Sequence, residues 1–153
     1  MMRHWLLSIF ALVLFIPAAH AADNGLVTIK SAHSVPVTIN RLEAMLRKKG
    51  MTIFARVDHQ RGAKKVKLSL RPTTLLIFGN PRLGTPLMQC KQTVGIDLPQ
   101  KILAWEDAKG QVWLTYNDPQ YLAERHGLGT CGAAVVRKMS MALHHFAEAA
   151  AGH

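Results

Sequence analysis

Helix-start and helix-stop signals divide this chain into short elements. Ser34 followed by Pro36 is typical of a helix N-terminus, because serine caps free backbone N–H groups and proline is tolerated in the first turn. A helix that begins there ends at Gly50, which suits the left-handed position after a basic last turn. Thr85–Pro86 and Asp118–Pro119 repeat the start signal. These signals, and the helical spacing of apolar residues, predict helices at about residues 35–49, 85–92, 119–126 and 132–150.

Short β-rich runs fill the segments between these helices, at about residues 26–30, 51–57, 73–78, 102–105 and 112–116. Residues 58–62 and 79–84 have the composition of loops, and residues 63–68 are ambiguous, with a short helix as one interpretation. The order lacks the regular alternation of strand and helix that builds parallel sheets. We therefore predict an α+β fold, in which one mostly antiparallel sheet carries the long helices on one face.

The first residues have the pattern of a secretory signal peptide. Arg3 supplies a positive charge, residues 5–17 form an apolar run too short to span a bilayer, and residues 19–21 match an A-x-A cleavage site. We predict cleavage after Ala21 and a periplasmic protein; an uncleaved membrane anchor is the alternative. Removal of 21 residues from 153 leaves 132, so residues 22–153 form a single domain. No later stretch is apolar enough to span a membrane.

The mature chain is basic and contains two cysteines. Loss of one arginine from 19 basic side chains leaves 18 against 9 acidic ones, a net charge of +9 that favours anionic partners. Nucleic acid is not expected as a partner of an exported protein, and a basic soluble surface is the simpler explanation. Cys90 and Cys131 form an even count in an oxidising compartment and predict one disulfide, with two free buried thiols as the alternative.

The segment from Phe78 to Met88 is the most specific candidate for a ligand site. Its glycines allow close backbone approach, Arg82 adds a positive charge, and the Asn80 amide can donate or accept. With Thr85 as the cap, the free N–H groups of the following helix would attract a carboxylate or phosphate. We therefore predict an anionic small molecule bound by Asn80, Arg82, Gly84 and Thr85. In the alternative interpretation this is only a strand-to-helix turn.

Other polar residues are candidates for catalysis, ligand binding or metal binding. Asp58 and His59 end a strand, so His59 could act as a general base, although Asp58 could equally cap nearby amides. Asn117 ends another predicted strand and joins the candidate ligand-binding residues. His144 and His145 are neighbours on a helix and diverge, so they do not support a metal site. We predict no metal and no cofactor.

Several ordered motifs resemble those of the domain-of-unknown-function family numbered 302. The similarity covers roughly residues 34–128 and lies in segments 57–59, 70–81, 84–88, 97–99, 105–107 and 116–119. The resemblance implies a compact α+β domain with a β-α-β4-α order similar to that of the TATA-binding protein. It implies neither DNA binding nor any catalytic residue, because a fold does not determine a function. The two cysteines are similar to a feature of secreted members, which adds support for the disulfide.

Three functional hypotheses follow from the sequence. The first is a periplasmic binding module for a small anionic ligand at residues 79–86. The second is a structural or interaction protein, such as a homodimer or an accessory of an envelope complex, because no convincing catalytic constellation is present. The third is a small enzyme that uses His59 as general base.

Overall fold

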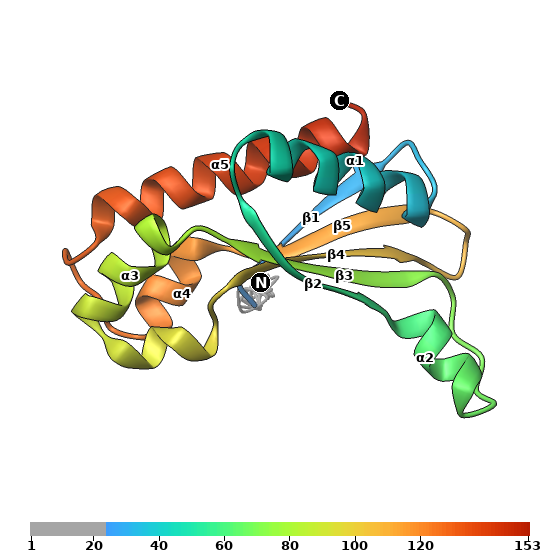
Figure 1. Ribbon diagram of the computed structural model, residues 1–153, viewed down its shortest axis with the longest axis horizontal. Coiled ribbons are helices and arrows are strands. Elements are labelled where there is room, and N and C mark those ends of the chain that lie inside the picture. Colours follow the sequence, from blue (N-terminus) through green and yellow to red (C-terminus); the bar gives the residue numbers. More distant parts are fainter. Residues whose placement is uncertain (1–23) are drawn as a thin grey trace, which may run out of the picture.

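The computed structural model describes residues 24–153, so the predicted signal peptide, residues 1–21, lies outside the described residues. Within these described residues the chain forms one five-stranded sheet and five α-helices (Figure 1). The elements are β1 (Leu26–Ser31), α1 (Val35–Lys48), β2 (Thr52–Asp58), α2 (His59–Lys65), β3 (Thr73–Gly79), α3 (Pro81–Cys90), the 3-10 helix η1 (Gln92–Ile96), β4 (Gln100–Glu106), β5 (Val112–Asn117), α4 (Pro119–Arg125) and α5 (Ala133–Ala151).

The sheet is entirely antiparallel. Its strand order is β1-β5-β4-β3-β2, so strands β2 to β5 form a meander and β1 closes the far edge against β5. The last helix is tied to this edge, because the Ala32 backbone N–H donates to the Ala151 carbonyl over 2.9 Å. The predicted α+β class and β-α-β4-α order are therefore confirmed.

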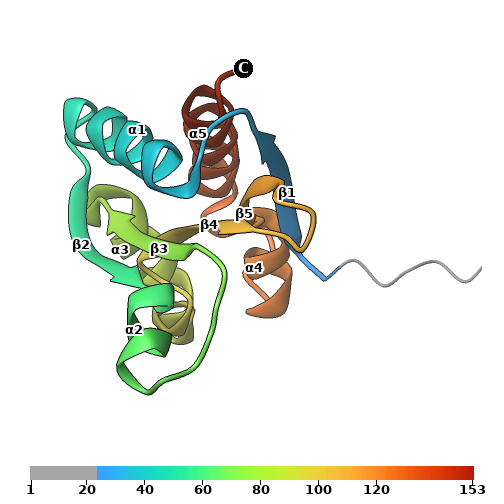
Figure 2. The same cartoon turned by 90° about the vertical axis from the view of Figure 1, so that its right-hand side faces the viewer.

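Helices α1 and α5 lie side by side over one face of the sheet (Figure 2). In α1 the residues at helical spacing, Ile39, Leu42 and Leu46, are fully buried, as their periodicity predicts. They pack with Leu76 and Leu114 from the centre of the sheet. This larger cluster is the main core of the domain.

A second, smaller cluster lies at one end of the sheet, where α3, η1, α4 and the first turns of α5 meet. Its buried members are Leu87, Val94, Ala123, Leu128, Val136 and Met139. Beside it, Cys90 at the end of α3 and Cys131 before α5 form the predicted disulfide, with 5.9 Å between their Cα atoms. The bridge joins two segments that are 41 residues apart.

Helix α3 begins earlier than the sequence predicts, so the predicted loop at residues 79–84 and the Thr85 cap are wrong. Asn80 is the cap: its side-chain oxygen accepts from the Arg82 backbone N–H over 2.9 Å, and Pro81 occupies the first turn. Pro86 lies inside the helix. Asn–Pro and Thr–Pro are both start signals, and asparagine is at least as good a cap as threonine.

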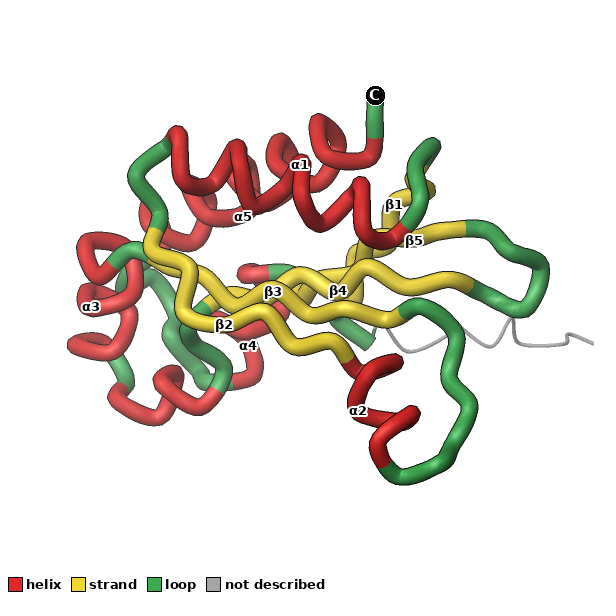
Figure 3. Tube along the Cα trace, turned by 45° about the vertical axis from the view of Figure 1, so that its right-hand side comes forward, coloured by secondary structure: helices red, strands yellow, loops and turns green. Residues whose placement is uncertain are grey.

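Helix α2 occupies the predicted polar loop and projects from the opposite end of the sheet (Figure 3). Asp58 is its N-cap, because its side-chain oxygen accepts from the Arg61 backbone N–H over 2.8 Å. The capping role considered for Asp58 is therefore the one observed. None of the α2 residues is buried, so apolar periodicity could not reveal this helix.

Candidate functional site

A cavity of about 230 Å³ lies at the end of the sheet where β3 ends, β4 begins, and α3 and α5 pass. It borders both hydrophobic clusters, since Phe78, Leu143 and Phe146 of the main core and Met139 of the smaller cluster all line it. Most of its wall is apolar. The further apolar lining residues are Met51, Phe54, Pro81, Leu83, Met88, Leu98, Pro99 and Ala142.

A register shift in β2 contributes one wall of the cavity. The pairing between β2 and β3 is irregular between Ile53 and Ala55, and Phe54 at this bulge is 55% exposed while lining the cavity. Bulges commonly re-aim a side chain in this way. The predicted strand 51–57 gave no sign of the bulge, so the sequence interpretation missed Phe54.

The cavity wall also contains polar side chains, and Gln100 is the most unusual of them. This residue begins β4, pairs with Phe78 in the sheet and is only 7% exposed. Its Nε2 is buried and has no hydrogen-bond partner among residues 24–153. A buried amide without an acceptor costs roughly 1–3 kcal/mol, which an acceptor atom on a bound molecule would offset. Sequence reasoning missed Gln100, because it directly follows Pro99 at the start of an ordinary strand.

Three of the predicted ligand-binding residues line the cavity: Asn80, Gly84 and Thr85. Gly84 is helical, and a Cβ at this position would lie 3.6 Å from Leu98 Cδ1, at ordinary contact distance. The absence of a side chain there leaves space in the cavity and is not required by the backbone. The predicted segment 79–86 thus forms a wall of the cavity. It does so as part of a helix, whereas the sequence predicted an anion-binding loop.

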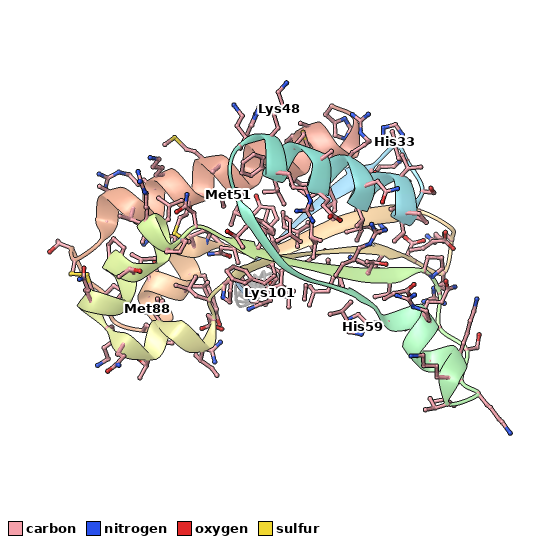
Figure 4. All side chains as sticks on the ribbon, in the orientation of Figure 1. His33, Lys48, Met51, His59, Met88 and Lys101 are labelled. Carbon is pink, nitrogen blue, oxygen red and sulfur yellow. A yellow bond between two sulfur atoms is a disulfide. The ribbon has the colours of Figure 1, made fainter. Side chains whose placement is uncertain are left out.

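The other predicted residues lie elsewhere. Arg82 is exposed and does not line the cavity, and Asn117 pairs with Leu26 near the β1 edge. Asp58 pairs with Thr74, at the end of β3 remote from the cavity. His59 is exposed at the start of α2 and points away from the helical layer (Figure 4). The structure therefore does not bring Asp58 or His59 together with Asn80 and Thr85.

A part-buried contact between His126 and Asp97 lies just before the cavity-lining strand. His126 Nε2 is 2.6 Å from Asp97 Oδ2, and Arg125 Nη1 is 3.5 Å from the other carboxylate oxygen. Thr93 Oγ1 approaches His126 Nδ1 at 3.4 Å. This contact joins α4 to the segment that leads to Gln100 and so positions the cavity wall. Arg125 and His126 follow the general preference for basic residues at helix ends, and no local signal indicated a partner distant in sequence.

Asp107 has a structural role in the hairpin between β4 and β5. Its carboxylate accepts from the Trp113 indole N–H over 2.9 Å and from the backbone N–H groups of Lys109 and Gln111. The indole hydrogen bond, with these backbone N–H groups, lowers the pKa of Asp107 despite partial desolvation. These contacts explain Asp107 as a turn residue, separate from the cavity.

Among residues 24–153 no group of three or more His, Cys, Asp or Glu side chains is arranged to hold a metal ion. In the same part of the chain, no helix has the length and hydropathy needed to cross a membrane.

Comparison with known families then assigns the domain. The sequence profile of the family described as "Domain of unknown function DUF302" matches residues 27–146. This chain belongs to the DUF302 family. The match extends beyond the resemblance at residues 34–128, since it includes β1 and most of α5.

A solved DUF302 structure supports the same fold. The crystal structure of an uncharacterized conserved DUF302 protein from Bacillus stearothermophilus superposes with a TM-score of 0.70 and covers 84% of this chain and 96% of that chain. The sequences are 17% identical, so the comparison concerns the fold alone.

Curated relatives of this DUF302 chain carry a different name. Proteins named "Fluoride-specific ion channel FluC 1" from Brucella suis and Brucella abortus are each 54% identical to it over 123 residues. These matches cover 80% of this chain but 48% and 46% of the two relatives. The DUF302 chain therefore spans about half the length of the curated relatives it matches.

Proposed function

We propose that this DUF302 domain binds a small, largely apolar molecule that carries a hydrogen-bond acceptor. The observation that carries the proposal is an apolar cavity whose lining includes Gln100, a residue with a buried and unpartnered side-chain Nε2. Ligand sites typically combine an apolar wall with a few polar groups that fix orientation. At about 230 Å³ the cavity is below the roughly 300–1,000 Å³ of drug-sized sites, which favours a small ligand.

The residues that line the cavity narrow the class of anionic ligand that was expected at residues 79–86. Arg82 does not line the cavity, so the apolar body of the ligand supplies most of the contact area. A carboxylate or carbonyl oxygen would accept from Gln100, and the net charge of +10 on the whole chain favours an anion over a cation. A small carboxylic acid with an apolar tail meets both requirements.

We place this binding function in the periplasm. The N-terminal apolar run and the A-x-A pattern support export, and the Cys90–Cys131 disulfide is compatible with an oxidising compartment. Intact mass of the protein purified from its own cells tests this placement. A chain that begins at Ala22 is expected; a chain that retains residues 1–21 would contradict cleavage.

Binding is tested with octanoate, an apolar-tailed carboxylate, by isothermal titration calorimetry. We expect Gly84→Leu to abolish binding, because the new side chain fills the cavity. Gly62→Leu is the matched control, since Gly62 lies in α2 with nothing within 4 Å of an added Cβ. Equal affinities of the two variants would contradict the proposed site.

The role of the amide is tested separately with Gln100→Leu, which keeps the size of the side chain and removes the donor. We expect octanoate affinity to fall about tenfold or more, which corresponds to loss of one hydrogen bond of about 1.5 kcal/mol. Stability should not fall, because the substitution also removes a buried unsatisfied donor. Unchanged octanoate affinity would show that Gln100 does not contact the ligand.

A second candidate function is an accessory role beside a membrane channel. It is favoured by the 54% identity to about half of proteins named fluoride-specific ion channels. Because a channel needs membrane-spanning elements and residues 24–153 contain no such helix, the other half of those relatives would supply the channel. The apolar cavity wall offers too few donors for a strongly hydrated fluoride ion, so the expected role is interaction with a channel. Co-purification of this chain with a fluoride channel from the same organism tests it, and complete separation of the two proteins would count against it.

A further inference from the structure

The second surface of interest lies at the end of the sheet opposite the cavity. Helix α2 and the connection to β3, residues 59–72, project beyond the strands (Figures 1 and 3). We call residues 59–71 the projecting segment. It contains no buried residue, apart from partial burial at Gln60 and Ala63. Because this segment is so exposed, it contributes little to the core, and core packing does not restrict its amino-acid composition.

The projecting segment is uniformly positive. It contains five basic residues and no acidic one. Arg61 Nε lies 3.9 Å from Asp58 Oδ2. The Arg71 Nε–H donates to the Glu106 carbonyl over 3.1 Å. The remaining three, Lys64, Lys65 and Lys67, are exposed and have no ion-pair partner among residues 24–153. These three lysines thus present unneutralised charge to an external partner.

Exposed aliphatic side chains lie next to this charge. Val66, Leu68 and Leu70 are 65%, 66% and 42% exposed, and they alternate with polar or basic residues. Helix α2 ends in a tight turn here: Lys67 has a positive φ of 62°, and the Leu68 backbone N–H donates to the Ala63 carbonyl over 3.0 Å. The turn gathers basic and aliphatic side chains at the tip of a protrusion.

We propose that the projecting segment docks the domain on an anionic lipid bilayer. Its lysines match negatively charged headgroups, and its aliphatic side chains suit insertion at the boundary between headgroups and acyl chains. Because the tip extends beyond the sheet, it can reach this boundary while the folded body stays outside the bilayer. A nucleic acid would satisfy the charge but would leave the aliphatic side chains exposed to water. This docking function is independent of the cavity and of its ligand.

The charge requirement is tested by co-sedimentation with vesicles that contain phosphatidylglycerol. We expect Lys64→Gln/Lys65→Gln/Lys67→Gln to lower the partition coefficient by at least about tenfold, since each lysine near an anionic surface adds attraction. Lys48→Gln/Lys49→Gln is the control, because these lysines are also exposed and Lys48 lies on the opposite side of the domain from α2 (Figure 4). All variants keep the same N-terminal residues, so differences between them report on the projecting segment.

The apolar requirement is tested with Val66→Ser/Leu68→Ser. We expect this variant to bind the same vesicles several-fold more weakly, whereas Ile96→Ser/Met141→Ser should bind like the unmodified protein. Ile96 and Met141 are 76% and 68% exposed and therefore provide a matched loss of exposed apolar surface elsewhere. Because all four positions are exposed, the variants should fold, and circular dichroism checks this.

Several results would overturn the proposal. One is equal binding to pure phosphatidylcholine vesicles, which lack net negative charge. Another is an equal loss of binding in the Lys48/Lys49 control, which would indicate general basicity of the surface. Full binding by the Val66/Leu68 variant would exclude aliphatic insertion, and lysine-dependent binding to a DNA oligonucleotide without binding to vesicles would identify a different partner.

Discussion

The two hydrophobic clusters are formed by different kinds of secondary-structure elements. The main core joins five antiparallel strands to two long helices, and most of its side chains are fully buried. The smaller cluster joins three short helical segments to the first turns of α5, and its residues are 2–8% exposed. Long periodic elements can interdigitate along their whole length, whereas short helices meet at irregular angles. The cavity opens where these two kinds of packing meet, along α5.

The largest expected difference between the clusters concerns loss of a buried leucine. Leu114→Ala in the main core should cost about 4 kcal/mol of unfolding free energy, because the surrounding sheet and helices cannot close the space. Leu87→Ala in the smaller cluster should cost about 2 kcal/mol, since α3 can move toward the gap. Urea denaturation of both variants measures this. An equal or larger loss for Leu87→Ala would remove the distinction between rigid and adaptable packing.

Removal of the disulfide tests the smaller cluster more directly. Replacing Cys90 and Cys131 by alanine opens a 41-residue loop and should cost about 4 kcal/mol by loop-closure entropy. We expect backbone hydrogen exchange to accelerate most in α3 and α4 and least in β3 and β4. Exchange that rises uniformly would show that the bridge stabilises the whole domain equally.

Alkaline pH should instead destabilise the main core, and we expect the free energy of unfolding to fall by about 2–3 kcal/mol. Burial of Tyr116, with smaller contributions from the negative charges of Asp118 and Glu148, raises the pKa of its phenol to about 12. The folded state therefore holds this proton more tightly than the unfolded chain, whose pKa is about 10. The associated stability is fully present below pH 10 and is lost as pH rises toward 12.

The informative comparison is with Tyr116→Phe, which removes the phenol. This variant should lose less stability between pH 10 and pH 12 than the unmodified protein, as measured by thermal unfolding. Identical pH profiles would show that Tyr116 ionisation does not limit the main core.

The same contrast explains what the sequence predicted. The apolar periodicity of α1 and the β-rich apolar run of β3 both reflect burial in the core, so these elements and the α+β class were predicted. Helix α3 was misplaced because two cap-plus-proline signals compete within the seven residues 80–86. Helix α2 and η1 have too few buried residues to produce a pattern.

The candidate site was only partly predictable for a related reason. Residues 79–86 were predicted as a site because glycine, proline and asparagine cluster there, and six of these eight residues line the cavity. The opposite walls come from Phe54, Gln100 and Met139, which are far apart in the chain and individually unremarkable. Only the packing of α5 across the end of the sheet brings them together.

The pairing of β1 with β5 has a consequence for the order of folding. Residues 26–31 can join the sheet only after residues 112–117 have been synthesised, because the two segments pair with each other. Helix α5 then stabilises this edge of the sheet by a backbone hydrogen bond. During synthesis, a chain that lacks its last helix would hold strands β2 to β5 with an unfinished core and a first strand without a stable partner. Completion of the domain therefore depends on contacts between residues far apart in the sequence, which makes folding slow compared with that of helical proteins of this size. Until those contacts form, the first strand stays extended and unpaired.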